Sequence, residues 1–67
     1  MKVIINDKNE ELAAGTTVAK LVEKLYPEAK GGIAVAINDN IVRKADWESR
    51  EIAEGDVIVL IHAAYGG

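Results

Sequence analysis

The sequence contains no cysteine, no phenylalanine and a single proline among its 67 residues. Without cysteine, the chain has no disulfides, no thiolate metal ligands and no cysteine nucleophile of its own. No apolar run approaches the length of a membrane-spanning helix, and the first residues lack the charged and then apolar layout of a signal peptide. These absences favour a small cytoplasmic domain with no membrane partner.

An excess of basic charge is also missing. The net charge is −3, and acidic and basic residues are interspersed along the chain. Binding of nucleic acid requires a basic footprint and usually aromatic side chains for stacking, so this composition argues against it. His62 is the single histidine, and no cluster of His, Asp and Glu predicts a metal site.

The first half of the chain predicts a hairpin followed by a helix. Lys2–Ile5 has the composition of a strand, Asn6–Asn9 is rich in turn-forming residues, and Glu10–Ala13 is predicted to return as a second strand. Thr17 is a candidate helix cap before an apolar stripe with i, i+3, i+4, i+7 spacing. Its members are Val18, Leu21, Val22 and Leu25.

The second half predicts short strands separated by turns. Ile33–Asn38 carries large residues on one face and alanines on the other, and Asp39-Asn40 is a candidate turn before a partner strand at Ile41–Arg43. Residues 45–52 are too polar for a full helix and predict a helical turn or loop, with Trp47 at the edge of the core. The last strand is predicted from Val57 to Ile61 or His62.

This order of elements indicates an α+β fold, because one helix covers only one face of a mixed four- to five-stranded sheet. A helix between a hairpin and later strands is the layout of the β-grasp, or ubiquitin-like, fold, with the last strand central and parallel to the first. We expect a single domain over residues 1–67 with a flexible tail at 63–67. The predicted core comprises Val3, Ile5, Leu12, Val18, Leu21, Val22, Leu25, Ile33, Val35, Ile37, Ile52, Ile58 and Leu60.

The last strand is apolar on both faces. If Ile58 and Leu60 meet the helix, Val57, Val59 and Ile61 point away from it. A contiguous apolar patch on a small acidic protein indicates a binding surface. The predicted partner-binding surface comprises Ile4, Ala34, Ala36, Val59 and Ile61.

The chain ends in the tail Tyr65-Gly66-Gly67 directly after this strand. Glycine has no Cβ, so such a tail passes through a narrow channel and leaves its terminal carbonyl carbon unhindered. The five residues from Ala63 to Gly67 reach roughly 16–18 Å at ~3.3–3.6 Å each. By composition alone, the same tail is also compatible with an ordinary disordered end.

Taken together, these features resemble the ThiS family of sulfur-carrier proteins over nearly the whole chain. The resemblance rests on short segments that occur in the same order at this length. They are Ile5-Asn6, Ala14–Val18, Val35–Asn38 followed by Ile41-Val42, Trp47-Glu48, Glu54–Asp56 and Gly66-Gly67.

The resemblance implies a carrier and not an enzyme, with no bound cofactor and no metal. In such a carrier, a ThiF-type adenylating enzyme uses ATP to activate the carboxylate of Gly67. A sulfur donor protein then converts it to a thiocarboxylate, and thiazole synthase receives the sulfur for thiamine. We expect the free carrier to be a monomer. Alternatives are a carrier of the kind found as the small subunit of molybdopterin synthase, a ubiquitin-like protein modifier, and a plain interaction module.

Overall fold

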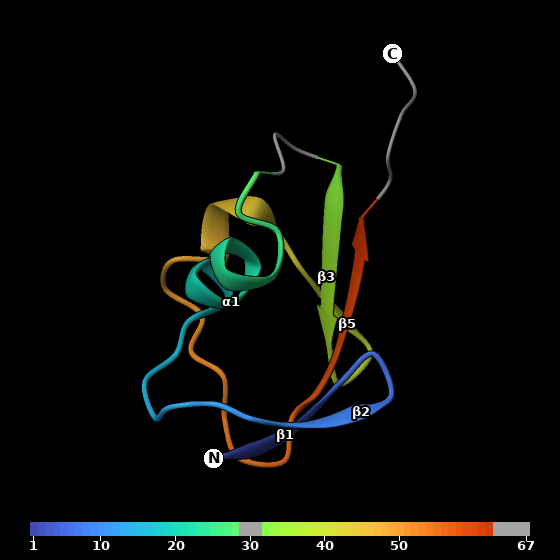
Figure 1. The fold of residues 1–67 in the computed structure, drawn as a ribbon. Coiled ribbons are helices and arrows are strands. Elements are labelled where there is room, and N and C mark those ends of the chain that lie inside the picture. The colour runs from blue at the N-terminus through green and yellow to red at the C-terminus, as the bar shows by residue number, and fades with distance from the viewer. Residues whose placement is uncertain (29–31, 63–67) are drawn as a thin grey trace.

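The structure is a computed structural model, and it describes residues 1–28 and 32–62. Five strands form one sheet in the order β2-β1-β5-β3-β4, and the helix α1 lies on one side of it (Figure 1). The elements are β1 Lys2–Ile5, β2 Lys8–Glu11, α1 Val18–Leu25, β3 Ile33–Ile37, β4 Asn40–Val42, the 3-10 turn η1 Lys44–Asp46, and β5 Val57–His62.

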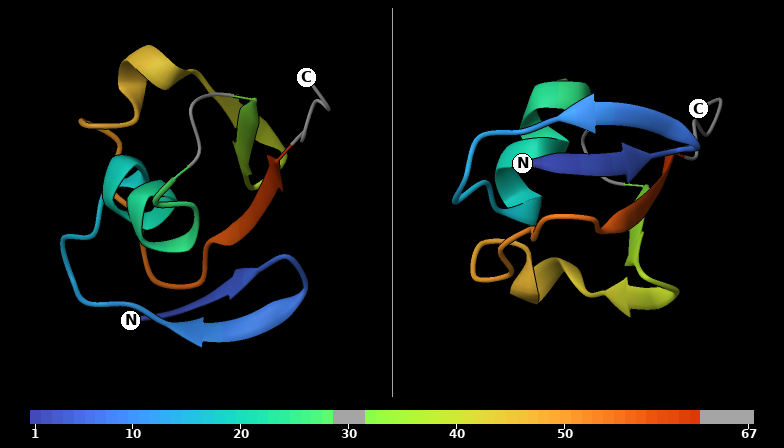
Figure 2. Two further views of the ribbon diagram at one scale, coloured as in Figure 1. Left: turned by 45° about the horizontal axis from the view of Figure 1, so that its top comes forward. Right: turned by 90° about the horizontal axis from the view of Figure 1, so that it is seen from below.

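The last strand is at the centre of the sheet, as the sequence predicts. It pairs in parallel with β1 and antiparallel with β3. The views in Figure 2 show the β1–β2 hairpin on one flank of β5 and the β3–β4 hairpin on the other. The α+β class, the β-grasp layout and the position of the last strand are therefore confirmed.

Each hairpin turns at an Asn-Asp pair, and both residues of each pair have a left-handed backbone conformation. Asn6 and Asp7 have φ of 49° and 68°, and Asn38 and Asp39 have φ of 52° and 69°. Two consecutive residues with positive φ form the turn whose twist matches that of paired strands, and asparagine and aspartate tolerate this conformation. Each Asn-Asp pair therefore connects its two strands without further residues.

These tight turns correct two predicted boundaries. The prediction of a turn at Asn6–Asn9 and a strand at Glu10–Ala13 is wrong, because the two-residue turn lets the second strand begin at Lys8 and end at Glu11. The turn predicted at Asp39-Asn40 lies one residue earlier, so the partner strand is Asn40–Val42.

The helix α1 has its predicted bounds. The side-chain oxygen of Thr17 accepts a hydrogen bond from the backbone N–H of Lys20 at 3.2 Å, which confirms Thr17 as the cap. The chain leaves the helix at Tyr26, immediately before Pro27. The predicted helical turn after β4 is present as η1, and Trp47 packs partly buried against the core.

The core lies between α1 and the sheet, and two predicted members do not belong to it. Leu25 is 43% exposed, because Tyr26 packs against the core at that end of the helix instead. Ile33 is partly buried, because it begins β3 at the end of the sheet, opposite the last residue of β5. The other predicted core residues are buried: Val3, Ile5, Leu12, Val18, Leu21, Val22, Val35, Ile37, Ile52, Ile58 and Leu60.

Candidate functional site

The side of the sheet that α1 does not cover carries a continuous set of aliphatic side chains. Strand alternation separates the two sides of β5: Ile58 and Leu60 are buried, whereas Val59 and Ile61 are 43% and 59% exposed. This confirms which residues of the last strand face the helix. We call this set the open face; its members are exposed except for Ala36, which is half-buried. It comprises Ile4, Ala34, Ala36, Ile41, Val57, Val59 and Ile61.

The pairing register explains why these side chains form one surface. Across the antiparallel pair of β3 and β5, Ala34 lies opposite Ile61 and Ala36 lies opposite Val59. On the other flank of β5, Ile4 lies beside Val57. The two alanines are short, so the larger side chains of β5 project beyond them. The five residues of the predicted surface are thus brought together, while their role in binding stays a prediction.

Val57 was expected to point away from the helix but is not among the five residues of the predicted surface, and Ile41 was not assigned to either side. Ile41 is 73% exposed and pairs with Ala36, which places it on the open face. Its face depended on the register of the β3–β4 hairpin, and that register shifts by one residue if the turn is misplaced. The Asn38-Asp39 pair is the signal in the sequence that fixes the turn.

Side chains from both hairpin turns hold β5 in place. The carbonyl oxygen Oδ1 of Asn38 accepts from the N–H of Val57 at 3.0 Å, and that of Asn6 accepts from the N–H of Leu60 at 2.9 Å. Asn38 also donates to the buried carboxylate of Asp56 at 3.0 Å, and Asp56 accepts from the N–H of Ala53 at 2.8 Å. The start and the middle of the strand are therefore anchored by hydrogen bonds.

At the end of β5, the exposed His62 makes an aromatic contact with Tyr26, which packs against the core. The rings of Tyr26 and His62 are tilted by 48° with their centroids 5.1 Å apart. Sequence reasoning assigned His62 no role and did not pair it with Tyr26. The predicted reactive residue Gly67 and the tail residues Gly66 and Tyr65 lie outside the residues that the structure describes.

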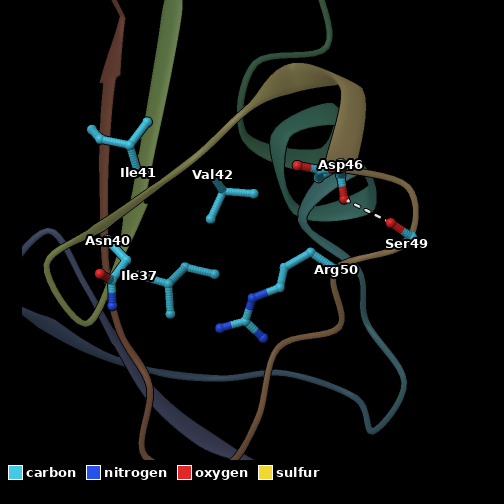
Figure 3. A pocket seen from close by; sticks show the side chains of 7 residues that line it. All are labelled: Ile37, Asn40, Ile41, Val42, Asp46, Ser49 and Arg50. Atoms are coloured by element: carbon cyan, nitrogen blue, oxygen red, sulfur yellow. Dashed lines mark hydrogen bonds between the residues drawn. The ribbon is translucent and has the colours of Figure 1, made fainter.

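A groove lies beside β4, between that strand and the segment that follows it (Figure 3). The guanidinium of Arg50 projects into the groove, and its Nη1 donates to the carbonyl of Glu51 at 2.6 Å. The rest of the lining of the groove combines aliphatic side chains with isolated polar ones. The lining residues are Ile37, Asn40, Ile41, Val42, Asp46, Ser49 and Arg50.

The part of the chain that the structure describes holds neither a metal site nor a membrane-spanning helix. Within residues 1–28 and 32–62, no group of three or more His, Cys, Asp or Glu side chains is placed to hold a metal ion. Among the same residues, no helix has the length and apolar character needed to cross a membrane.

A mixed five-stranded sheet with one helix and an apolar open face defines a small β-grasp protein. The crystal structure of the thiamine biosynthesis protein ThiS from Geobacter metallireducens superimposes with a TM-score of 0.82 at 19% identity, with 100% of both chains covered. A solution NMR structure of a thiamine biosynthesis protein from the same organism gives 0.81 at 20% identity, covering 100% of this chain and 88% of that one. At these identities the two likenesses establish the fold.

Sequence comparison narrows the class to a family. The ThiS family model matches residues 3–67. The sulfur carrier protein ThiS of Escherichia coli (strain K12) is 37% identical over 67 residues, with 100% of both chains covered. The chain therefore belongs to the ThiS family.

Proposed function

We propose that this chain is a sulfur carrier for thiamine biosynthesis. The observation that carries the proposal is the end-to-end match, at 37% identity, to a protein named sulfur carrier protein ThiS. The family match extends through Gly67, so the glycine pair falls inside the matched region. The chain acts in the cytoplasm as a co-substrate of other enzymes and not as a catalyst.

The chemistry takes place at the terminal carboxylate of Gly67. A carboxylate is ionised at neutral pH but is a poor electrophile. One of its oxygens attacks the α-phosphorus of ATP, pyrophosphate leaves, and an acyl-adenylate forms. A sulfur nucleophile then attacks the acyl carbon and AMP leaves. Hydrosulfide gives the thiocarboxylate directly; a persulfide gives an acyl disulfide, which a thiol reduces to the thiocarboxylate.

Three partners follow from this sequence of steps. A ThiF-type adenylating enzyme binds ATP and activates Gly67, a sulfur donor protein supplies the sulfur, and thiazole synthase accepts it. The carrier itself binds no cofactor. Gly66 and Gly67 suit a narrow channel because neither has a Cβ, and Tyr65 precedes them in the same tail.

The open face supports the proposal because it supplies a docking surface beside the strand that leads to the tail. Ordering a tail in a channel costs conformational entropy, and docking of an apolar surface offsets that cost. Four aliphatic side chains of β1 and β5 are exposed there, and two of them, Val59 and Ile61, lie within the last four residues of β5. The apolar surface is therefore near the point where the tail begins.

Mass spectrometry of the intact chain tests the function. After incubation with the ThiF-type enzyme, ATP and a sulfur source, we expect a mass increase equal to the replacement of one oxygen by sulfur. Conjugates joined to other proteins through Gly67 would instead identify a protein modifier, and an unchanged mass would leave a plain interaction module. Sulfur transfer to thiazole synthase, assayed beside transfer to the molybdopterin precursor, separates the two carrier pathways.

Substitution of Ile61 by Asp tests docking through the open face. Ile61 is 59% exposed in the free chain, so the change costs little folding free energy, within about 0.5 kcal/mol as for other surface sites. A carboxylate buried against an apolar partner surface costs far more, and we expect the KM of the adenylating enzyme for the chain to rise about tenfold or more. Adenylation kinetics and a denaturant titration measure the two effects.

Leu25→Asp is the matched control for this experiment. Leu25 is an aliphatic residue of similar exposure, 43%, but it belongs to the helix on the other side of the sheet. We expect its KM to stay close to that of the unaltered chain. Equal effects of Ile61→Asp and Leu25→Asp on KM would contradict docking through the open face.

A further inference from the structure

The central strand β5 has two neighbours along only part of its length. It pairs with β3 from Ile58 to His62, but β1 reaches it only at Val57 and Ile58. Figure 1 shows the β1–β2 hairpin beside the lower part of β5, while β3 accompanies the strand further up. The upper part of β5 therefore has a free edge on the β1 side.

The alternation of hydrogen bonds identifies the main-chain groups at this edge. In an antiparallel pair, alternate residues bond to the partner strand, and the N–H of Asn38 donates to the carbonyl of Val57 at 2.8 Å. Val57, Val59 and Ile61 thus direct their main-chain groups to β3. The alternate residues Ile58, Leu60 and His62 direct theirs to the β1 side.

Asn6 ends the ladder on that side. Its N–H donates to the carbonyl of Ile58 at 2.9 Å, and its side-chain Oδ1 accepts from the N–H of Leu60 at 2.9 Å. The side-chain oxygen of Asn6 thus takes the place of a main-chain carbonyl, which would accept from the N–H of Leu60 if β1 were longer. Beyond it, the carbonyl of Leu60 and the N–H of His62 have no partner among residues 1–28 and 32–62. Leu60 is a buried residue, whereas His62 is exposed.

The outer edge strands of the sheet, β2 and β4, have features that discourage pairing with another chain, and the free edge of β5 lacks them. β2 carries the exposed charged residues Lys8, Glu10 and Glu11, and charges on an edge strand discourage pairing with another chain. β4 has only three residues, and Asp46 and Arg50 line the groove beside it (Figure 3). The free edge of β5 is instead bordered by the aliphatic side chains of the open face.

We propose that an extended segment of the activating enzyme pairs with this edge at the exposed His62, with one of its carbonyls accepting from the N–H of His62. The inference rests on the proposed function. His62 is five residues from Gly67, a reach of roughly 16–18 Å, so an enzyme that holds Gly67 lies against this end of β5. The edge is also continuous with the open face, on which the same enzyme docks.

Strand addition at this edge gives the partner a contact that apolar docking lacks. Main-chain hydrogen bonds along a sheet edge supply affinity and align the added strand with its neighbour, while pockets for alternate side chains supply specificity. A partner strand beside Leu60 and His62 therefore sets the direction in which the chain leaves the sheet. The tail then enters the active site along a defined line.

Amide hydrogen exchange tests the pairing without any substitution. The N–H of Ile61 is directed to Ala34 of β3, so we expect it to exchange slowly in the free chain and in the complex. The N–H of His62 should exchange rapidly in the isotopically labelled free chain and at least about tenfold more slowly with saturating ThiF-type enzyme, as for other strand-paired amides. Unchanged exchange at His62 in the saturated complex overturns the inference.

A pair of variants provides the second test. His62→Pro and His62→Ala both remove the ring that contacts Tyr26, but only proline also removes the N–H. We expect the KM for adenylation to be up to about tenfold higher for His62→Pro than for His62→Ala, the effect of one hydrogen bond. The kcat ratio should stay near one. Equal KM values in the two variants, with matching melting temperatures, contradict the pairing.

These tests separate the inference from the function on which it rests. If the unaltered chain is adenylated while His62 stays unprotected in the complex, the strand pairing is wrong and the carrier function stands. If the unaltered chain is not adenylated at all, the proposed function is overturned, and the pairing with that enzyme is overturned with it.

Discussion

Extension of the chain by a short tag after Gly67 is expected to abolish adenylation. The tag converts the terminal carboxylate into an amide, which has no ionised oxygen to attack the α-phosphorus of ATP. We expect the rate of ATP–pyrophosphate exchange to fall by at least about a thousandfold, equivalent to ~4 kcal/mol of activation free energy. The melting temperature should not change, because the described fold ends with β5 at His62.

Gly67→Ala is the matched control for the tag. It keeps a carboxylate at the same distance from β5 and adds only one methyl group. If the rate of ATP–pyrophosphate exchange falls less in this variant than in the tagged chain, the effect of the tag is due to the missing carboxylate. A tagged chain that is adenylated at the normal rate would rule out Gly67 as the reactive residue.

Ile58→Ala is expected to bring the domain close to unfolding. Ile58 is 0% exposed and is the second residue of the central strand β5. Truncation of such a side chain costs about 2–5 kcal/mol, from lost burial and the cavity left behind. At ~0.05–0.15 kcal/mol per residue, a chain of 67 residues has a total stability of about 3–10 kcal/mol. The substitution therefore removes about a fifth or more of the free energy of unfolding, which a urea titration measures.

Ile61→Ala is the control on the same strand. Ile61 is 59% exposed, so its truncation should change the free energy of unfolding by no more than about 0.5 kcal/mol. Comparable losses at the two positions would show that the helix-facing and open sides of β5 contribute equally to the core. That result would contradict the division of the strand into a buried and a docking side.

Much of the fold was predictable because its signals are local. The stripe from Val18 to Leu25 and the cap at Thr17 specify the helix within one stretch of sequence. The alternation of β5 likewise assigns Ile58 and Leu60 to the core and Ile61 to the open face. In both elements the period of apolar residues matches the period of the secondary structure, so a single sequence is sufficient.

The errors arose where an assignment depended on a turn or on a distant contact. The Asn38-Asp39 turn was placed one residue late, and Ile41 was therefore not assigned to a face. Leu25 continues the apolar stripe, yet Tyr26 takes the place against the core at that end. The first error concerns a local signal, the Asn38-Asp39 pair, whereas the second depends on the tertiary packing of Tyr26, which helix periodicity does not contain.

The sequence by itself determined the order of the elements and the two sides of the last strand. Only the tertiary structure decided how far β1 accompanies β5, and hence that the N–H of His62 has no partner on that side among the described residues. The side chain of Asn6 ends the ladder of hydrogen bonds between β1 and β5, and Asn6 lies 54 positions before Leu60 in the sequence. Pairing length and register depend on such long-range contacts, whereas helices, turns and strand alternation depend on residues close together in the chain.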